Sequence, residues 1–513
     1  MVSLARPRLL YFNGPWNYLG ARILNSYIDP FRRLLEQDFD IVSVEGDRDF
    51  RVEVETHRPD VVMFHTGSEA PGEPEVDISN TDAFPEIPRL GYMFRDPFSP
   101  SRMPTMNRLK AWRVDQVFTD FRPTDSAAPY FRDTMYLPWW IDDTVFRDYG
   151  EAKEFAVTLT GSGWRSKCIY VWRSEVCLEL LPKVPIFHAP SLGNRQNGHD
   201  YVGESYSRLL NRSQFSAGCG TVNRYLTMKL LEIPASRCCL IAEEIEVLKA
   251  AGFRDGENCI FATKENVVDK VRTLLSDPRR LQAITDAGHR LVHDRHTQRN
   301  RRQFAEWFAL WKRRQPGDRI VQVNPLEPLQ LIPAGATVPA NTFPAENPLT
   351  EKLVRGYESL AAARWADALP KFEEIVGIIP CVAEARLGAA LCLLRLNRVP
   401  EAIAHLGYNV NLMVRHFGYR WPDPIDLAFL AVCHFRAKDA RTGVQLLASF
   451  ETLRHPALNA MRWIVAKSSP ALAARPVFQV SEGDNSSNVE SIHVLPQTTF
   501  PEWVGALMAG IRG

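Results

Sequence analysis

Short apolar runs rich in β-branched and aromatic residues alternate with helical patterns throughout the first 315 residues of the chain. Continuous runs of this kind are typical of parallel strands, because helices bury both faces of such a sheet. The first series lies at residues 8–12, 39–45, 59–66, 89–94 and 116–120, and the second at residues 155–163, 184–190, 237–243 and 258–262. The alternation predicts the α/β fold class, with two tandem Rossmann-like domains.

The chain of 513 residues is too long for one hydrophobic core, and its composition divides it further. We expect an N-terminal Rossmann-like domain at residues 1–145 and a second one at residues 146–315. A Pro-rich linker follows at residues 316–348, then helical repeats at residues 349–470 and an irregular tail at residues 471–513. The high proline content of the linker predicts an extended segment or a strap that lies on the preceding domain.

The predicted helical segment repeats itself with an offset of 34 residues. Phe372 in the first copy corresponds to Leu406 in the second, and Gly356 corresponds to Ala390. A third copy, displaced by a further seven residues, carries Ala431 at the small position and Leu447 at the large one. This alternation of small and large apolar positions resembles tetratricopeptide (TPR) repeats, an all-α stack whose concave face could bind a peptide or a partner protein.

Charge and cysteine usage narrow the class of protein. The chain carries 61 basic and 60 acidic residues, and this balance argues against a dedicated nucleic-acid binder. Its nine cysteines include no Cys-x-x-Cys pair, as expected for reduced thiols. The N-terminus lacks the apolar segment of a signal peptide, and no apolar run is long enough to span a membrane. We therefore expect a cytoplasmic protein without a membrane span.

Several candidate ligand-binding residues follow the first strand of the second domain. Ligands of open α/β sheets bind at the carboxyl ends of the strands. Gly161, Ser162 and Gly163 would let backbone N–H groups approach an anion, and Arg165 and Lys167 could neutralise a diphosphate. The alternative is that this Gly-x-Gly forms only a tight turn.

Two further groups of charged residues lie near predicted strand ends. Lys229 and Glu232 share one face of a helix, and the apolar residues around Glu232 argue against a simple surface ion pair. A carboxylate at this position could accept hydrogen bonds from ribose hydroxyls. Glu243 and Glu244 follow the next strand and would face the same cleft, or one of them could cap the next helix.

Three segments of the second domain resemble the donor half of GT-B glycosyltransferases of the group 1 (family 4-like) kind. They are "TLTGSG" at residues 158–163, "YLTMKLLEIPASRCCLIAEEIEVLKAAGFRDGENCIFA" at 225–262 and "RLQAITDAGHRLVHDRHTQRNR" at 280–301. "YLPWWIDDTVF" at 136–146 resembles their interdomain P-x-x-x-D-x-x-x-F connector. The resemblance implies a nucleoside diphosphate sugar as donor substrate and no separate cofactor. It also implies that Glu232 binds the ribose and that Arg165 and Lys167 bind the diphosphate.

The sequence departs from this family at two positions. Retaining members carry Glu-x₇-Glu, and Arg224 occupies the place of the first glutamate while Glu232 matches the second. The stereochemical course is therefore open. Arg237 stands where the family has a glycine, which would require a locally different turn or would place positive charge near the donor.

An inverting transferase needs a general base for the acceptor hydroxyl, and the first domain offers three candidates. Asp96, Glu69 and His65 all lie at or after predicted strand ends. Each has a structural alternative, since Asp96 could cap a turn and Glu69 could be a solvated loop acid. The acidic pair in residues 47–49 has the spacing of a metal-binding motif but is interpreted as a charged loop, and we expect no metal.

These observations predict a metal-independent glycosyltransferase that moves a sugar from a nucleoside diphosphate sugar to a glycan, such as a surface polysaccharide, or to a protein acceptor. The repeats would recruit the acceptor or a protein partner. Two alternatives stay open: a sugar-nucleotide-processing enzyme such as an epimerase, and a non-catalytic repeat scaffold on a degenerate transferase.

Overall fold

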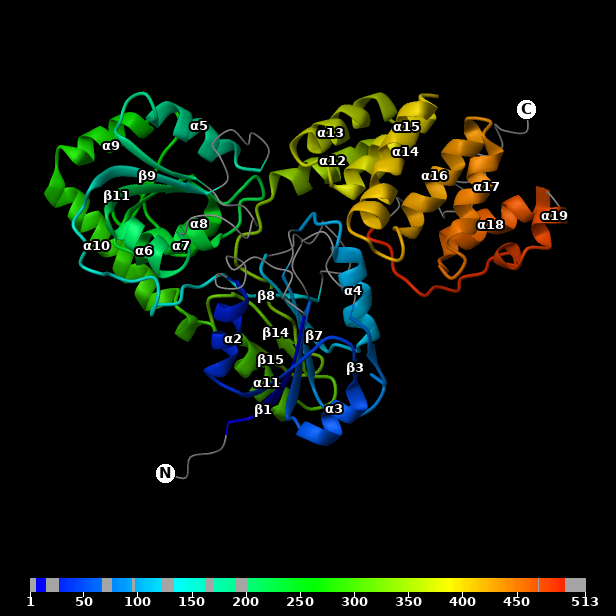
Figure 1. Ribbon diagram of the computed structural model, residues 1–513, viewed down its shortest axis with the longest axis horizontal. Helices are drawn as coiled ribbons and strands as arrows, with labels where there is room; N and C mark the ends of the chain where they lie inside the picture. The colour runs from blue at the N-terminus through cyan, green and yellow to red at the C-terminus, as the bar shows by residue number, and fades with distance from the viewer. Residues whose placement is uncertain are drawn as a thin grey trace.

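The structure is a computed structural model, and it consists of two α/β domains followed by a helical region (Figure 1). It describes residues 6–14, 27–66, 76–94, 97–121, 133–161, 169–190, 201–468 and 470–493. No helix among these residues is long and apolar enough to cross a lipid bilayer.

The first domain contains a six-stranded sheet in the order β2-β1-β4-β6-β7-β8, and all of its pairings are parallel. The strands are β1 (Arg8–Asn13), β2 (Asp40–Glu45), β4 (Val61–Thr66), β6 (Arg89–Met93), β7 (Gln116–Thr119) and β8 (Met135–Tyr136). Alternate residues of β1 enter different cores, since Leu9 and Tyr11 pack toward α2 (Asp29–Glu36), whereas Leu10 and Phe12 pack toward α3 (Phe50–His57) and α4 (Arg102–Ala111). Helices therefore cover both faces, as predicted from the apolar runs.

The second domain contains a parallel five-stranded sheet in the order β10-β9-β11-β12-β13. Its strands are β9 (Phe155–Gly161), β10 (Ile186–Pro190), β11 (Ser213–Gly218), β12 (Cys239–Ala242) and β13 (Ile260–Phe261). Its helices are α5 (Val171–Leu180), α6 (Glu204–Asn211), α7 (Met228–Ala235), α8 (Glu246–Ala250), α9 (Val267–Leu275) and α10 (Pro278–Arg295).

The central strand β11 was missing from the predicted strands because its sequence, SQFSAG, has little apolar character. The buried hydroxyl of Ser213 is hydrogen-bonded instead. Ser213 Oγ lies 2.5 Å from Thr158 Oγ1 on β9 and donates to the carbonyl of Leu209. A polar residue can occupy a central strand where neighbouring elements supply partners.

Gly288 on α10 allows that helix to approach the turn before β13 closely. A β-carbon at Gly288 would lie 2.5 Å from the carbonyl oxygen of Asn258. Gly288→Ala is expected to lower the free energy of unfolding by about 2 kcal/mol, because the backbone must shift. Gly377→Ala on α13 (Trp365–Ile378) is the control, since nothing lies within 4 Å of its added carbon. Thermal unfolding of both variants checks this, and equal melting temperatures would contradict it.

After α10 the chain returns to the first domain. The helix α11 (Gln303–Arg313) carries Phe304, whose ring lies 4.7 Å from Phe118 and 5.7 Å from Phe31. This helix therefore packs on the first domain, although the sequence grouped it with the second. The Pro-rich segment then forms the hairpin β14 (Arg319–Val321) and β15 (Gln330–Ile332), and Gln322 exchanges hydrogen bonds with the backbone of Tyr136.

The helical region stacks antiparallel helices in the order predicted by the repeat. They are α12 (Pro348–Ala361), α13 (Trp365–Ile378), α14 (Ala383–Arg395), α15 (Val399–Asn411), α16 (Pro424–Arg436), α17 (Ala440–Ser449) and α18 (Pro456–Ser468). The starts of α13, α15 and α17 are 34 and then 41 residues apart, which matches the displaced third copy. Phe372 of α13 fits against Gly356 and Gly388, where added β-carbons would lie within 2.7 and 2.4 Å of its ring.

The inner helices of this stack are covered by other parts of the chain. Nearly every residue of α14 and α16 is buried. Phe98 and Met103 of the first domain belong to the same apolar core, as do Val477, Phe478, Val489 and Ile492 of the tail. Arg102 on α4 forms a buried ion pair with Glu384 at 2.5 Å, and Figure 1 shows α4 reaching the helical region.

The tail is fastened by a buried cluster of Asp423, Asp426 and His493. Asp423 caps α16 through Ile425 N and also accepts hydrogen bonds from Ser491 Oγ and Ile492 N. His493 Nε2 lies 3.1 Å from Asp426 Oδ1. Burial alone would lower the pKa of His493, but Asp426 and Asp423 outweigh it and raise this pKa to about 9.

This cluster predicts a loss of stability above neutral pH. The pKa of His493 is higher in the folded chain than its value of about 6.5 in an unfolded chain. The stability that protonated His493 contributes is therefore complete below a pH of about 6.5, and it is lost as the pH rises through about 9. Thermal unfolding between these limits should show a falling melting temperature, with a shallower decline in His493→Gln. Equal slopes for the two proteins would contradict this prediction.

Candidate functional site

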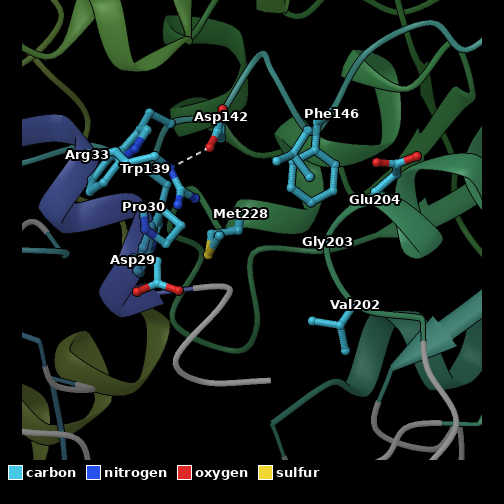
Figure 2. A pocket seen from close by; sticks show the side chains of 12 residues that line it. Asp29, Pro30, Arg33, Trp139, Asp142, Phe146, Val202, Gly203, Glu204 and Met228 are labelled. Carbon is cyan, nitrogen blue, oxygen red and sulfur yellow. Dashed lines mark ion pairs between the residues drawn. The ribbon is translucent and has the colours of Figure 1, made fainter. Parts of the chain in front are cut away.

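The two sheets turn their carboxyl ends toward a shared cleft. One cavity of about 280 Å³ lies between the start of α2, which follows β1, the connector at residues 139–146, and the starts of α6 and α7 in the second domain (Figure 2). A smaller one is lined by Phe121 after β7 and by residues 223–225 after β11. Both cavities therefore lie where ligands of open α/β sheets bind.

The interdomain connector is held by its own aspartate. Asp142 accepts hydrogen bonds from the backbone and hydroxyl of Thr144, and its other oxygen lies 2.8 Å from Arg33 Nε of α2. Figure 2 shows this pair on one wall of the cavity, with Phe146 and Met228 on the other side. Asp142 and Phe146 are the aspartate and phenylalanine of the P-x-x-x-D-x-x-x-F pattern. The pattern thus contributes side chains to two sides of the cavity.

His296 and Arg301, which follow α10, hold the connector from the other side. Arg301 is buried and donates to the carbonyls of Pro138 and Trp139 and to His296 Nδ1. His296 Nε2 lies 2.8 Å from the carbonyl of Ala251. Burial, with a smaller contribution from Arg301, lowers the pKa of His296 to about 3, so the ring stays neutral. It can then accept from Arg301 and donate to Ala251.

Lys229 lies at the carboxyl end of β9. Its Nζ donates to the carbonyl oxygen and to Oγ1 of Thr160, at 3.0 Å each. The hydroxyl of Tyr206 on α6 lies 3.1 Å from the same Oγ1. This network places the ammonium group beside Gly161, the last residue of β9.

Glu232 is 8% exposed, so it is not a surface carboxylate. It lies one turn after Lys229 on α7, and its charge acts on Tyr206, whose pKa is raised by burial first and by Glu232 next. The alternative of a weak surface ion pair is therefore wrong for this residue. A buried carboxylate near an interdomain cavity fits the expected ribose ligand.

Arg173 is a candidate binding residue that the sequence analysis did not identify. It lies on α5 and is 6% exposed. Cys219 follows β11, and burial raises the pKa of its thiol. Arg173 and Lys229 lower this pKa and Glu243 raises it, so these three charged side chains lie around Cys219. The sequence did contain a signal for this residue. Arg173 precedes Val176 and Cys177 by three and four residues, and this helical spacing places the arginine on the apolar face of its helix.

Arg224 and Glu243 meet at the carboxyl ends of β11 and β12. Arg224 adopts a left-handed backbone conformation, with φ of +53°, and its guanidinium lies 3.9 Å from Glu243. Burial raises the pKa of Glu243, and Arg224 lowers it. Glu244 points elsewhere, since its side chain is 61% exposed and pairs with Lys249 at 2.9 Å.

The remaining predicted residues divide into two groups. Asp96, Glu69, Ser162, Gly163, Arg165 and Lys167 lie outside the described residues. His65 on β4 is 5% exposed, its Nδ1 lies 2.5 Å from the hydroxyl of Tyr11, and its ring packs against Phe31 and Tyr92. These contacts place it in the core of the first domain.

Arg237 does not bring charge to the donor side, so that expectation is wrong. Its backbone takes the left-handed conformation that glycine favours, with φ of +56°. Its side chain pairs with Asp286 at 2.8 Å and with Asp148 at 3.4 Å. The residue precedes β12, and it therefore lies at the amino end of the sheet, opposite the cleft.

Among the described residues, Asp423, Asp426 and His493 form a group whose ligand atoms are close enough to hold a metal ion. The group lies in the helical region rather than in the cleft. Both oxygens of Asp423 already accept hydrogen bonds from the backbone and from Ser491. This arrangement fits the ion pair with His493 described above.

The comparison with protein families agrees with the geometry of the second domain. Residues 144–306 match the sequence profile of a family described as glycosyl transferase-like. The match contains the second sheet, α7 with Lys229 and Glu232, and the segment after α10 with His296 and Arg301. No curated protein is significantly similar to the chain in sequence.

Three solved structures are similar to parts of the chain. HepE of Anabaena in complex with UDP is 12% identical over 59% of this chain and 99% of its own, with a TM-score of 0.37. Sucrose-phosphate synthase of Thermosynechococcus elongatus is 10% identical over 60% and 99%, with a TM-score of 0.39. The C-terminal domain of the group 1 glycosyl transferase LpcC of Francisella tularensis is 17% identical over 31% and 98%, with a TM-score of 0.24.

Two parallel α/β sheets that share a cleft give the chain the arrangement of the GT-B fold, and its second domain matches a glycosyl transferase-like family. The expected fold class is confirmed, including the all-helical region of stacked helices.

Proposed function

We propose that the protein transfers a sugar from a nucleoside diphosphate sugar to a glycan or protein acceptor. The observation that carries this proposal is the buried Glu232 beside Lys229, at the carboxyl edge of the sheet that matches the glycosyl transferase-like family. A carboxylate at this edge of the sheet can accept hydrogen bonds from both hydroxyls of a ribose.

The donor would lie along the second domain. Glu232 would accept hydrogen bonds from the ribose, while Lys229 and Arg173 supply positive charge near the end of β9. Arg165 and Lys167, together with the backbone after Gly161, would bind the diphosphate. Cations at the leaving group stabilise the charge that develops as the sugar departs. Glu243 would face the transferred sugar, whereas Glu244 is exposed and paired with Lys249 and is not proposed to contact the donor.

The acceptor would enter from the side of the first domain. Asp96 and Glu69 are proposed as general bases on their positions after strands of that domain, and His65 as a base only if the aromatic residues around it move apart. No metal is proposed in the cleft. The TPR-like repeats would recruit the acceptor or a partner through the outer helices α13, α15 and α17, because α14 and α16 are covered by the chain itself.

A panel of nucleoside diphosphate sugars tests the proposal. The purified chain is expected to hydrolyse one donor slowly in the absence of acceptor, and to do so equally well in the presence of a chelator. Hydrolysis that requires an added divalent cation would overturn the metal-independent reaction. Tight binding of one donor without any hydrolysis or transfer would support the scaffold alternative.

Variants of the outer helices are a better probe of recruitment than truncation. Removing the helical region would expose Phe98 and leave the buried Arg102 without its partner Glu384, and the first domain would lose part of its packing. Charge reversal at the exposed residues of α13 should lower transfer to the native acceptor and leave donor hydrolysis unchanged.

A further inference from the structure

The end of the Pro-rich segment lies in the cleft between the two α/β domains. Phe343 is 2% exposed and its ring lies 5.8 Å from that of Tyr136 in the first domain. Residues 343–347 and residues 223–225 together line a space of only about 20 Å³. Such a space holds about one water molecule. The segment therefore closes one side of the cleft.

Two contacts join this segment to the turn after β11. Glu346 Oε2 lies 3.6 Å from Arg224 Nη1. Asn347 Nδ2 donates to Asn223 Oδ1 at 3.3 Å, and both asparagines are buried. Asn347 Oδ1 also accepts from the backbone N–H groups of Leu349 and Thr350, which makes it the N-cap of α12. The first helix of the helical region is thus tied directly to the donor domain.

Arg224 is held between two carboxylates from distant parts of the chain. Glu243 comes from the end of β12 and Glu346 from the Pro-rich segment, and their distances to the guanidinium are 3.9 and 3.6 Å. Both distances exceed that of a hydrogen bond, so the carboxylates attract the guanidinium without using its N–H donors in short bonds. The side chain of Arg224 is 40% exposed and keeps donors available toward the cleft.

We propose that Glu346 is a positioning residue of the donor site, which orients Arg224 for contact with the sugar substrate and makes that site depend on the Pro-rich segment. This inference rests on the proposed function. It adds a residue that lies outside the domain matched to the glycosyl transferase-like family, since that match ends at residue 306.

The electrostatics of Glu243 give this proposal a specific signature. Burial raises the pKa of Glu243, Arg224 lowers it and Glu346 raises it. The charged and titratable groups that interact electrostatically with Glu243 are Arg224, Glu346 and the thiol of Cys219. Removing the charge of Glu346 should therefore lower the pKa of Glu243 and move the acid limb of the activity profile to lower pH.

A double-mutant cycle of Arg224→Gln and Glu346→Gln tests the proposal on the full chain, with the donor that the wild type hydrolyses. When two residues belong to one hydrogen-bond or ion-pair network, the interaction energy between their substitutions corresponds to a change of about tenfold in a binding constant. Glu346→Gln should raise the KM for the donor by about this factor with a smaller change in kcat. The double variant should be no worse than Arg224→Gln, and Glu346→Asp should restore part of the loss.

The control is Glu327→Gln, because Glu327 is an exposed carboxylate of the same segment. Melting temperatures of all variants are measured beside the kinetics. If Glu346→Gln matches Glu327→Gln in KM, kcat and pH profile, or if its effect adds fully to that of Arg224→Gln, Glu346 has no positioning role. If the wild type binds and hydrolyses no donor at all, the proposed function fails instead.

Discussion

Glu232→Gln is expected to weaken the binding of nucleoside diphosphates by a factor of about 10 to 100, because hydrogen bonds to a charged group contribute about 1.5–3 kcal/mol. The glutamine keeps the volume of the side chain but replaces one acceptor oxygen by a donor. Glu232 is buried on α7, whose start lines the cleft. Calorimetric titration of the variant measures the loss.

Glu244→Gln is the matched control for this experiment. Glu244 follows β12, and its side chain is 61% exposed and pairs with Lys249. It is therefore expected to change the affinity by less than a factor of about 5, as is typical of exposed ion pairs. Wild-type affinity in a folded Glu232→Gln protein would remove Glu232 from the binding site.

Arg301→Met is expected to cause the largest loss of stability, about 3 kcal/mol or more, because it leaves buried carbonyl groups without donors. Arg301 is among the most deeply buried large side chains of the described residues and holds Pro138, Trp139 and His296 together. The variant should unfold at lower temperature, and its two α/β domains should lose their fixed connection. Thermal unfolding followed by calorimetry measures the change.

Arg302→Met provides the comparison for Arg301. The Arg302 side chain is 59% exposed and forms an ion pair with Asp38. Exposed ion pairs contribute less than about 1 kcal/mol. If the two variants had equal melting temperatures, Arg301 would not be the residue that holds the connector.

The sequence predicted the parts of the fold that depend on local pattern. The apolar runs identified the strands of the first sheet because helices bury both of its faces. The strand β11 escaped detection, since Ser213 is stabilised by Thr158 on a neighbouring strand, a contact that no local pattern reveals. The packing of Phe304 against Phe31 and Phe118 was equally inaccessible, because the sequence shows an amphipathic helix but not the surface it covers.

The sequence identified a residue of the candidate site where its polarity differed from that of the residues around it. Glu232 drew attention because a carboxylate stood among apolar residues, and the structure buries it. Arg224 was recognised as a departure from the family, but the reason for its position comes from Glu346 and Asn347. The contact between Asn223 and Asn347 joins residues 124 positions apart, which only the folded chain brings together.

Titration of the wild-type chain with a set of nucleoside diphosphates tests the central claim most directly. The account predicts that one nucleoside diphosphate binds with a stoichiometry of one per chain, that its sugar-bearing form competes for the same site, and that Glu232→Gln abolishes or strongly weakens the binding. Absence of binding by every nucleoside diphosphate, with the protein folded, would contradict the assignment of the cleft as a sugar-nucleotide site.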